Sequence, residues 1–196
     1  MTNSRTASEC SALVSDLRAS PRESEWVEFK VNNSNPTDIG EYISALANSA
    51  ALLDKRRAYV VWGIEDGTRK VVGTTFEPAT AKQGNEDLEN WLTRLLEPQV
   101  PFRFHTCEVE GVRGVVLEID SALHQPVRFS GEEYIRVGSY KKKLRDHPEK
   151  ERALWQRFTT TTFEDGIAAQ RLSGDDVLQV LAFPSYFDLL RVPLPS

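Results

Sequence analysis

Three acidic residues, Glu23, Glu28 and Asp66, stand where a catalytic metal centre could form. Glu23 precedes an expected strand, Glu28 lies on it, and Asp66 follows the next apolar strand. Carboxylates at one point repel one another unless a cation lies among them. A Mg²⁺ or Mn²⁺ ion there would neutralise phosphate charge and activate water. Glu23 and Glu28 converge only if the chain turns near Ser24 and Glu25, because five residues of ideal strand would point them to opposite faces. The alternative is three surface acids among the 29 of the chain.

Basic residues form a second group with possible chemistry. Lys30 lies two residues after Glu28, on the same face of the expected strand. Arg136 lies on a strand that runs into a glycine turn before Ser139, and an arginine beside backbone N–H groups suits a phosphate. A basic tract that could follow a nucleic-acid backbone comes next: Lys141, Lys142, Lys143 and Arg145. A solvated charge run is the alternative for this tract.

Other chemistries lack their motifs. The sequence has no GxxxxGK[ST] loop and no GxGxxG after a strand, which disfavours a P-loop ATPase and a dinucleotide-binding fold. Cys10 and Cys107 are the only cysteines and the three histidines are scattered, so we expect free thiols and no zinc. The net charge of -5 argues against a uniformly basic DNA coat, but it does not exclude a nuclease. No apolar run approaches the ~18 residues of a membrane helix, so we expect a cytoplasmic protein without a membrane partner.

Hydrophobic periodicity predicts the elements that would position these residues. Alternation at residues 25–31 indicates a half-buried strand, and the apolar run 58–64 indicates a central strand buried on both faces. Apolar stripes predict helices, one beginning at Thr37 or Asp38 as its N-cap and another over 88–96. Further strands are expected at 71–74, 102–110, 112–119, 126–129 and 134–137, and a helix opens at Pro148.

The chain divides into four expected parts. Residues 1–14 read as a flexible leader and residues 15–158 as the main domain, beginning with a short helix over 15–19. A threonine-rich stretch suggests a linker over 159–172. Residues 173–196 are expected to form a helical tail, which is too short to be a domain and suggests the start of a truncated region.

Five motifs in the same order resemble the Schlafen AlbA_2 domain. They are Glu23-Ser24 followed by Glu28-Phe29-Lys30, Ala45-Leu-Ala-Asn48, Gly63-Ile-Glu-Asp66, Gln125-Pro126-Val127, and Tyr134-Ile-Arg-Val-Gly-Ser139. The resemblance implies an α/β (α+β) fold, a mixed β-sheet sandwich with flanking helices, here with a short helical C-terminal extension. One segment departs from the family pattern: residues 49–57 lack the usual Gly-Gly pair, so we expect a different ligand geometry.

The resemblance also implies a function. In Schlafen nucleases, acids matching Glu23, Glu28 and Asp66 form a metal-dependent ribonuclease centre acting on transfer and ribosomal RNA. We therefore expect a divalent-metal-dependent endoribonuclease for structured RNA such as tRNA, with Lys30 as a further catalytic residue. Arg136, Ser139 and the basic tract would then bind nucleic acid, with RNA favoured over DNA. A non-catalytic DNA- or RNA-binding module of a transcriptional regulator is the alternative, and nucleotide binding is a weaker third. Vertebrate Schlafen nucleases clamp RNA between two lobes of one chain, so a single lobe predicts a homodimer.

Overall fold

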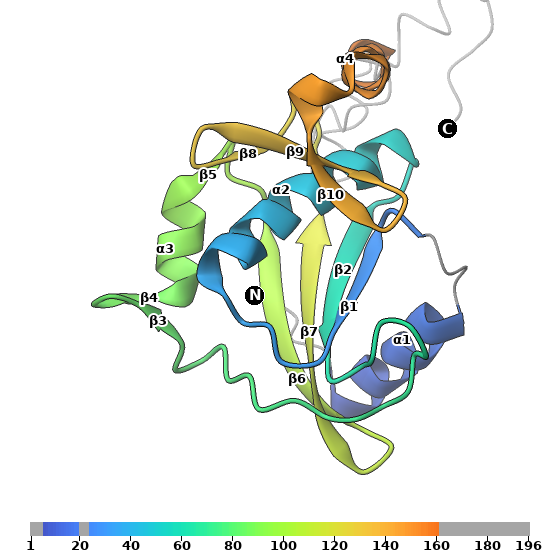
Figure 1. Cartoon of the computed structure of the whole chain (residues 1–196), viewed down its shortest axis with the longest axis vertical. Coiled ribbons are helices and arrows are strands. Elements are labelled where there is room, and N and C mark those ends of the chain that lie inside the picture. The colour runs from blue at the N-terminus through green and yellow to red at the C-terminus, as the bar shows by residue number, and fades with distance from the viewer. Residues whose placement is uncertain (1–5, 20–23, 161–196) are drawn as a thin grey trace, which may run out of the picture. The chain divides into compact units, whose positions relative to one another are not determined.

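The computed structural model describes residues 6–19 and 24–160, which form the mixed α/β sandwich with flanking helices expected from the sequence. Its two four-stranded sheets are visible in Figure 1. Sheet 1 has the order β1-β2-β7-β6, with β1 (Val27–Lys30), β2 (Arg57–Trp62), β6 (Phe102–Val109) and β7 (Val112–Asp120). Sheet 2 has the order β10-β9-β8-β5, with β5 (Leu96–Glu97), β8 (Arg128–Phe129), β9 (Glu132–Val137) and β10 (Tyr140–Lys143). Only the β1–β2 pairing is parallel among these strands.

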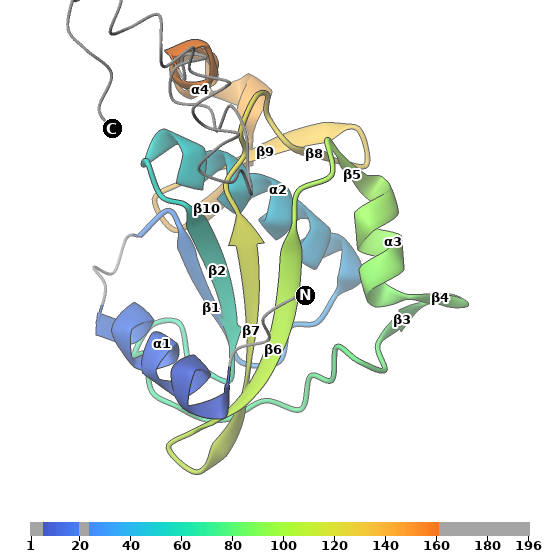
Figure 2. The ribbon, with the colours of Figure 1, turned by 180° about the vertical axis from the view of Figure 1, so that it is seen from behind.

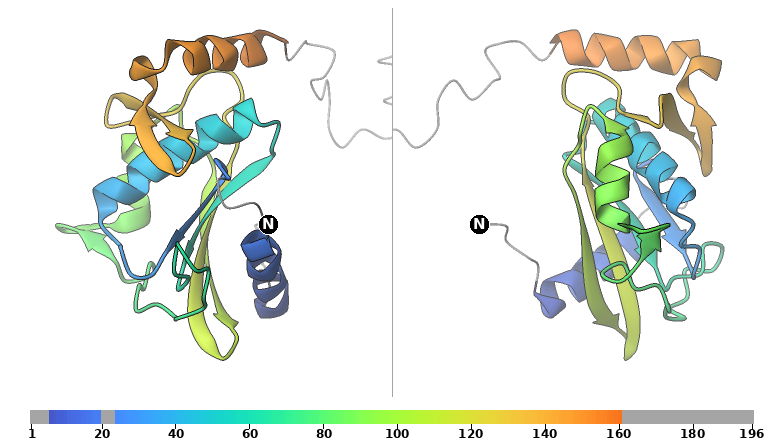
Figure 3. Two further views of the ribbon diagram at one scale, coloured as in Figure 1. Left: turned by 45° about the vertical axis from the view of Figure 1, so that its right-hand side comes forward. Right: turned by 90° about the vertical axis from the view of Figure 1, so that its left-hand side faces the viewer.

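Helices separate and cover the sheets. They are α1 (Ala7–Ala19), α2 (Pro36–Leu52), α3 (Leu88–Leu95) and α4 (Pro148–Thr160), with the short turn η1 (Leu144–Asp146) and a ribbon of β3 (Lys82–Gln83) and β4 (Glu86–Asp87). α1 packs on one face of sheet 1, as the rear view in Figure 2 shows. α2 lies on the opposite face, between sheet 1 and sheet 2, which is clearest in Figure 3.

β2 forms the centre of sheet 1 because its side chains are apolar on both faces. Val60 and Trp62 point into the core beneath α2, whereas Val61 joins the smaller cluster beneath α1. The expected strand over 58–64 is therefore confirmed as a central strand. The strand expected over 71–74 is reduced to an isolated bridge between Ile64 and Val71.

α2 begins at Pro36, three residues before Ile39, the first residue of its apolar stripe. The side chain of Asn35 accepts hydrogen bonds from the backbone N–H groups of Thr37 (2.9 Å) and Asp38 (3.2 Å), so Asn35 is the N-cap and the expectation of Thr37 or Asp38 was wrong. Pro36 follows at the first helical position, where its missing N–H costs nothing. Gly40 lets sheet 2 approach, because a Cβ there would meet the ring of Phe129 at 2.1 Å.

Buried polar side chains on α2 form hydrogen bonds with the backbone of sheet 2 and with the backbone of Val127, which precedes β8. Asn48 donates to the carbonyls of Val127 and Tyr134 (both 2.9 Å) and accepts from the N–H of Val127 (2.8 Å). Ser44 donates to the Val127 carbonyl (2.7 Å) and accepts from the Tyr134 N–H (3.0 Å). Ser49 accepts from the N–H of Arg136 (3.0 Å). Buried backbone groups need hydrogen-bond partners, and these side chains supply them where sheet 2 has no neighbouring strand.

The N-terminal segment differs from the expected flexible leader of residues 1–14. α1 is helical from Ala7, and it buries Cys10, Val14 and Leu17 against sheet 1. The free thiols of Cys10 and Cys107 meet beneath α1, and their hydrogen bond holds the pKa of Cys107 below its usual value. At the other end, α4 extends to Thr160, and the rest of the expected linker and the helical tail lie outside the described residues. None of the described helices is long and apolar enough to cross a bilayer.

Replacing Asn48 tests the attachment of sheet 2 to α2. Asn48→Ala should lower the free energy of unfolding by about 3 kcal/mol, because three hydrogen bonds are lost and buried backbone groups stay unpaired. Urea unfolding followed by circular dichroism would measure this loss. Asn90→Ala on the exposed face of α3 is the matched control and should cost nothing. Equal stability of the two variants would contradict this role for Asn48.

Candidate nucleic-acid interface and the Glu28 ion network

Glu28 lies buried at the centre of an ion network, facing α2 and sheet 2. Its side chain is 5% exposed, and both carboxylate oxygens are paired: Oε1 lies 2.6 Å from Lys30 Nζ and Oε2 lies 2.6 Å from Arg136 Nη2. Arg136 comes from β9 and is only 2% exposed. The pairing joins sheet 1 directly to sheet 2. The Nε and Nη1 atoms of Arg136 have no hydrogen-bond partner among the described residues, and its guanidinium lies 5.8 Å from the ring centre of Tyr42.

Tyr42 is the aromatic centre of this network. Besides Arg136, its ring is approached by the ammonium groups of Lys30 (5.2 Å) and Lys141 (4.5 Å). Burial raises the pKa of the Tyr42 hydroxyl, and the negative charge of Glu28 raises it further. Burial alone would lower the pKa of Lys30, but its hydrogen bond and charge contact with Glu28 outweigh burial and raise it. Lys30 therefore stays charged near neutral pH.

The basic tract is largely paired with acids. Lys141 is bound to Glu41 and lies 3.1 Å from Asp38. Lys143 and Arg145 share Glu132, at 2.8 and 3.4 Å. The sequence predicted no strand over these cations, whereas residues 140–143 form the edge strand β10.

Lys142 differs from the other cations of the basic tract. It makes no ion pair within the described part of the chain, and its ammonium lies 5.6 Å from the ring centre of Tyr140, which is 68% exposed. Ser139 is also exposed, at the turn before β10. This edge of sheet 2 therefore offers one unpaired cation beside one accessible aromatic ring.

The glycine turn expected to bind phosphate already holds an anion from the chain itself. The N–H of Gly138 donates to Oε1 of Glu25 at 2.8 Å, and Lys150 of α4 binds the same carboxylate at 2.8 and 2.9 Å. The turn has the anion affinity that the sequence indicates. Its ligand in the folded chain is the carboxylate of Glu25, which lies just before β1.

The structure describes two of the three expected metal ligands, Glu28 and Asp66. Glu28 is paired with two cations, and Asp66 is exposed in the turn that follows β2. Glu23 lies outside the described residues. No group of three acidic, histidine or cysteine side chains among the described residues could hold a metal ion. Because Glu23 lies outside the described residues, the expected Mg²⁺ or Mn²⁺ centre stays a prediction.

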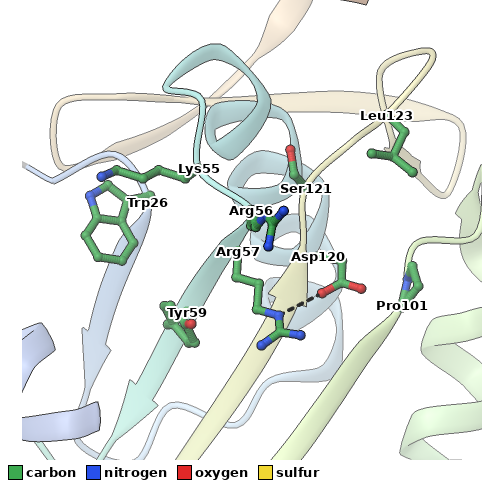
Figure 4. A pocket seen from close by; sticks show the side chains of 9 residues that line it. All are labelled: Trp26, Lys55, Arg56, Arg57, Tyr59, Pro101, Asp120, Ser121 and Leu123. Carbon is green, nitrogen blue, oxygen red and sulfur yellow. Dashed lines mark hydrogen bonds and ion pairs between the residues drawn. The ribbon is translucent and has the colours of Figure 1, made fainter. Parts of the chain in front are cut away.

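An open pocket, called the basin below, lies on the α1 side of sheet 1, where α1 leaves the end of the sheet uncovered (Figure 4). The sequence did not predict this pocket. Its volume is about 640 Å³. Three consecutive basic residues, Lys55–Arg57, line it directly after α2 ends, together with Trp26 and Leu123. The signal in the sequence was the basic triplet at the place where residues 49–57 depart from the family pattern.

The comparisons with known proteins establish the family. The Schlafen AlbA_2 family profile matches residues 23–145, more than half of the chain, and the chain therefore belongs to this family. Family membership supports a nucleic-acid-related domain. No curated protein sequence matches the chain.

Two solved structures of bacterial proteins are similar to part of this chain. The DIP2311 protein from Corynebacterium diphtheriae matches 67% of this chain at 17% identity, with a TM-score of 0.44, and this chain spans 26% of its length. The N-terminal domain of a protein described as related to the ATP-dependent DNA helicase RecG, from Nitrosomonas europaea, matches 70% of this chain at 21% identity. Its TM-score is 0.42, and 92% of that domain is covered.

Removing one member of the buried pair between Glu28 and Arg136 should destabilise the fold strongly. Glu28→Gln should lower the free energy of unfolding by about 3 kcal/mol, because Arg136 would stay buried without a countercharge. The double variant Glu28→Gln/Arg136→Met should cost less than the sum of its single changes, which a double-mutant cycle in urea measures. Glu89→Gln on the exposed face of α3 is the control. Additive single changes would show that the two side chains are not coupled.

Proposed function

We propose that this domain binds nucleic acid without cleaving it, and that RNA is preferred over DNA. The exposed pair of Lys142 and Tyr140 on β10 carries this proposal. An unpaired cation attracts the phosphate backbone, and an accessible aromatic ring can stack on a base, so the pair combines both requirements of nucleic-acid binding. RNA is proposed because the Schlafen nucleases that the motifs resemble act on transfer and ribosomal RNA.

The state of Glu28 favours binding over catalysis. Both oxygens of Glu28 are held at 2.6 Å by Lys30 and Arg136, so a divalent metal would have to compete with two cations for this carboxylate. Removing Glu28 would leave the buried charge of Arg136 uncompensated, which costs several kcal/mol. The network is therefore proposed to hold the two sheets together beneath the binding surface.

A metal-dependent endoribonuclease is the second candidate, and one observation favours it. Lys30 remains 23% exposed beside Glu28, so solvent reaches the edge of the acidic centre. This candidate requires Glu28 to exchange its two cations for a metal shared with Glu23 and Asp66. Lys30 and Arg136 would then be released toward the scissile phosphate.

Binding to tRNA should depend on salt and on Lys142. Lys142→Ala should weaken binding and reduce the slope of log affinity against log salt by about one, because one phosphate contact is lost. Fluorescence anisotropy with labelled tRNA in EDTA would measure both effects. Lys82→Ala on the β3–β4 ribbon removes an exposed lysine elsewhere and should change little. Binding that is insensitive to salt would contradict a backbone contact.

Incubation of the same tRNA with Mn²⁺ separates the two candidates, and intact tRNA is the expected result. Cleavage that disappears in Asp66→Asn would establish the nuclease instead. Asp66→Asn is the more informative variant, because Asp66 is exposed and its replacement should leave the fold unchanged. Replacing the buried Glu28 should destabilise the fold.

Self-association is a further part of the proposal. One lobe offers one binding surface, and a homodimer would place two such surfaces on a single RNA. Light scattering of the full chain should give twice the chain mass. A monomer mass at concentrations where tRNA binds would contradict the dimer and leave the binding proposal standing.

A further inference from the structure

The basin on sheet 1 has the size and the walls of a binding pocket. Pockets for small ligands occupy about 300–1,000 Å³, and this one measures about 640 Å³. Its floor is the end of sheet 1 around Arg57 and Tyr59, because α1 covers only the other end of that face. Trp26 and Lys55 lie on one side and Leu123 on the other, as Figure 4 shows.

Two of the three cations in the basin are available to an anion. Arg57 is held in place, with its guanidinium 3.2 Å from both Glu118 and Asp120. Lys55 and Arg56 form no ion pair among the residues that the structure describes, and both are exposed. Asp120 is the one carboxylate among the described lining residues, and Arg57 already engages it. The positive charge that remains is thus concentrated on two adjacent residues.

Aromatic and apolar side chains border these cations. The Lys55 ammonium lies 5.2 Å from the ring centre of Trp26, whose ring packs edge-on against Tyr59 at 6.1 Å between centres. Leu123 is 68% exposed and offers an apolar surface beside these cations. A ligand with a flat apolar part and one negative group would cover Leu123 and neutralise Lys55 and Arg56 together.

We infer that the basin takes one unstacked nucleotide of a single-stranded nucleic acid, with its phosphate on Lys55 and Arg56 and its base between Leu123 and Trp26. This inference rests on the proposed nucleic-acid binding and adds a second contact to that of β10. Two free cations suit the single charge of a phosphodiester better than the several charges of a nucleoside triphosphate. Flat bases bind aromatic and apolar side chains with little regard to sequence, so the pocket accepts any base.

Binding of a labelled single-stranded oligoribonucleotide of about eight nucleotides to the full chain tests this site. Lys55→Ala/Arg56→Ala should weaken binding about tenfold or more and reduce the salt slope by about one, because one phosphate contact is lost. Lys70→Ala/Lys82→Ala removes the same charge at exposed positions outside the basin and is the matched control. Leu123→Ala removes no charge and should weaken binding about threefold to tenfold at unchanged salt slope, because only base contact is lost.

The outcomes separate this inference from the proposed function. If Lys142→Ala weakens binding while the Lys55→Ala/Arg56→Ala variant binds like its control, the basin is not a nucleotide site but the domain still binds nucleic acid. If the wild-type chain binds neither tRNA nor the oligoribonucleotide, both ideas fail. An oligoglutamate peptide of equal charge that competes as well as unlabelled RNA would assign the basin to an acidic protein segment and overturn the inference.

Discussion

The position of α2 between two sheets is the constraint on which the rest of this structure depends. A helix buried on one side against sheet 1 and on the other against sheet 2 cannot be apolar all round, because the short strands of sheet 2 bring backbone groups that need partners. Ser44, Asn48 and Ser49 supply them. Ser49 holds the backbone of Arg136, so the same contact that attaches β9 also places the Arg136 side chain over Glu28.

Charge balance within this layer follows from that placement. Glu28 is matched by Lys30 and Arg136, while Lys141 is matched by Asp38 and Glu41, so three acids face three bases around Tyr42. Such a network is neutral as a whole and gives no net attraction for a phosphate. Its buried pairs are weak evidence for net stability, but each member is costly to remove alone. The network therefore acts as a specific connection between the sheets.

The sequence predicted the elements with clear periodicity and missed those whose pattern was mixed. The buried run of β2, the stripe of α2 and the hairpin of β6 and β7 all appear close to the expected bounds. α1 has an apolar stripe at helical spacing, but the polar residues between its members made the helix hard to recognise in the sequence. The stripe consists of Cys10, Leu13, Val14 and Leu17. β10 was missed because its lysines read as a solvated run. The candidate site was less predictable, because pairs such as Glu28 with Arg136 join residues far apart in sequence and no local pattern records them.

Unpaired charge, rather than charge density along the chain, decides which surfaces can bind an anion. The basic tract is the densest cluster in the sequence, yet folding gives acidic partners to Lys141, Lys143 and Arg145. The shorter triplet at residues 55–57 follows α2, whose last turn, residues 49–52, contains no glycine. The turn after that helix carries two exposed cations, Lys55 and Arg56, which form no ion pair in the described part of the chain. A segment that departs from the family pattern thus creates a surface that the shared motifs do not encode.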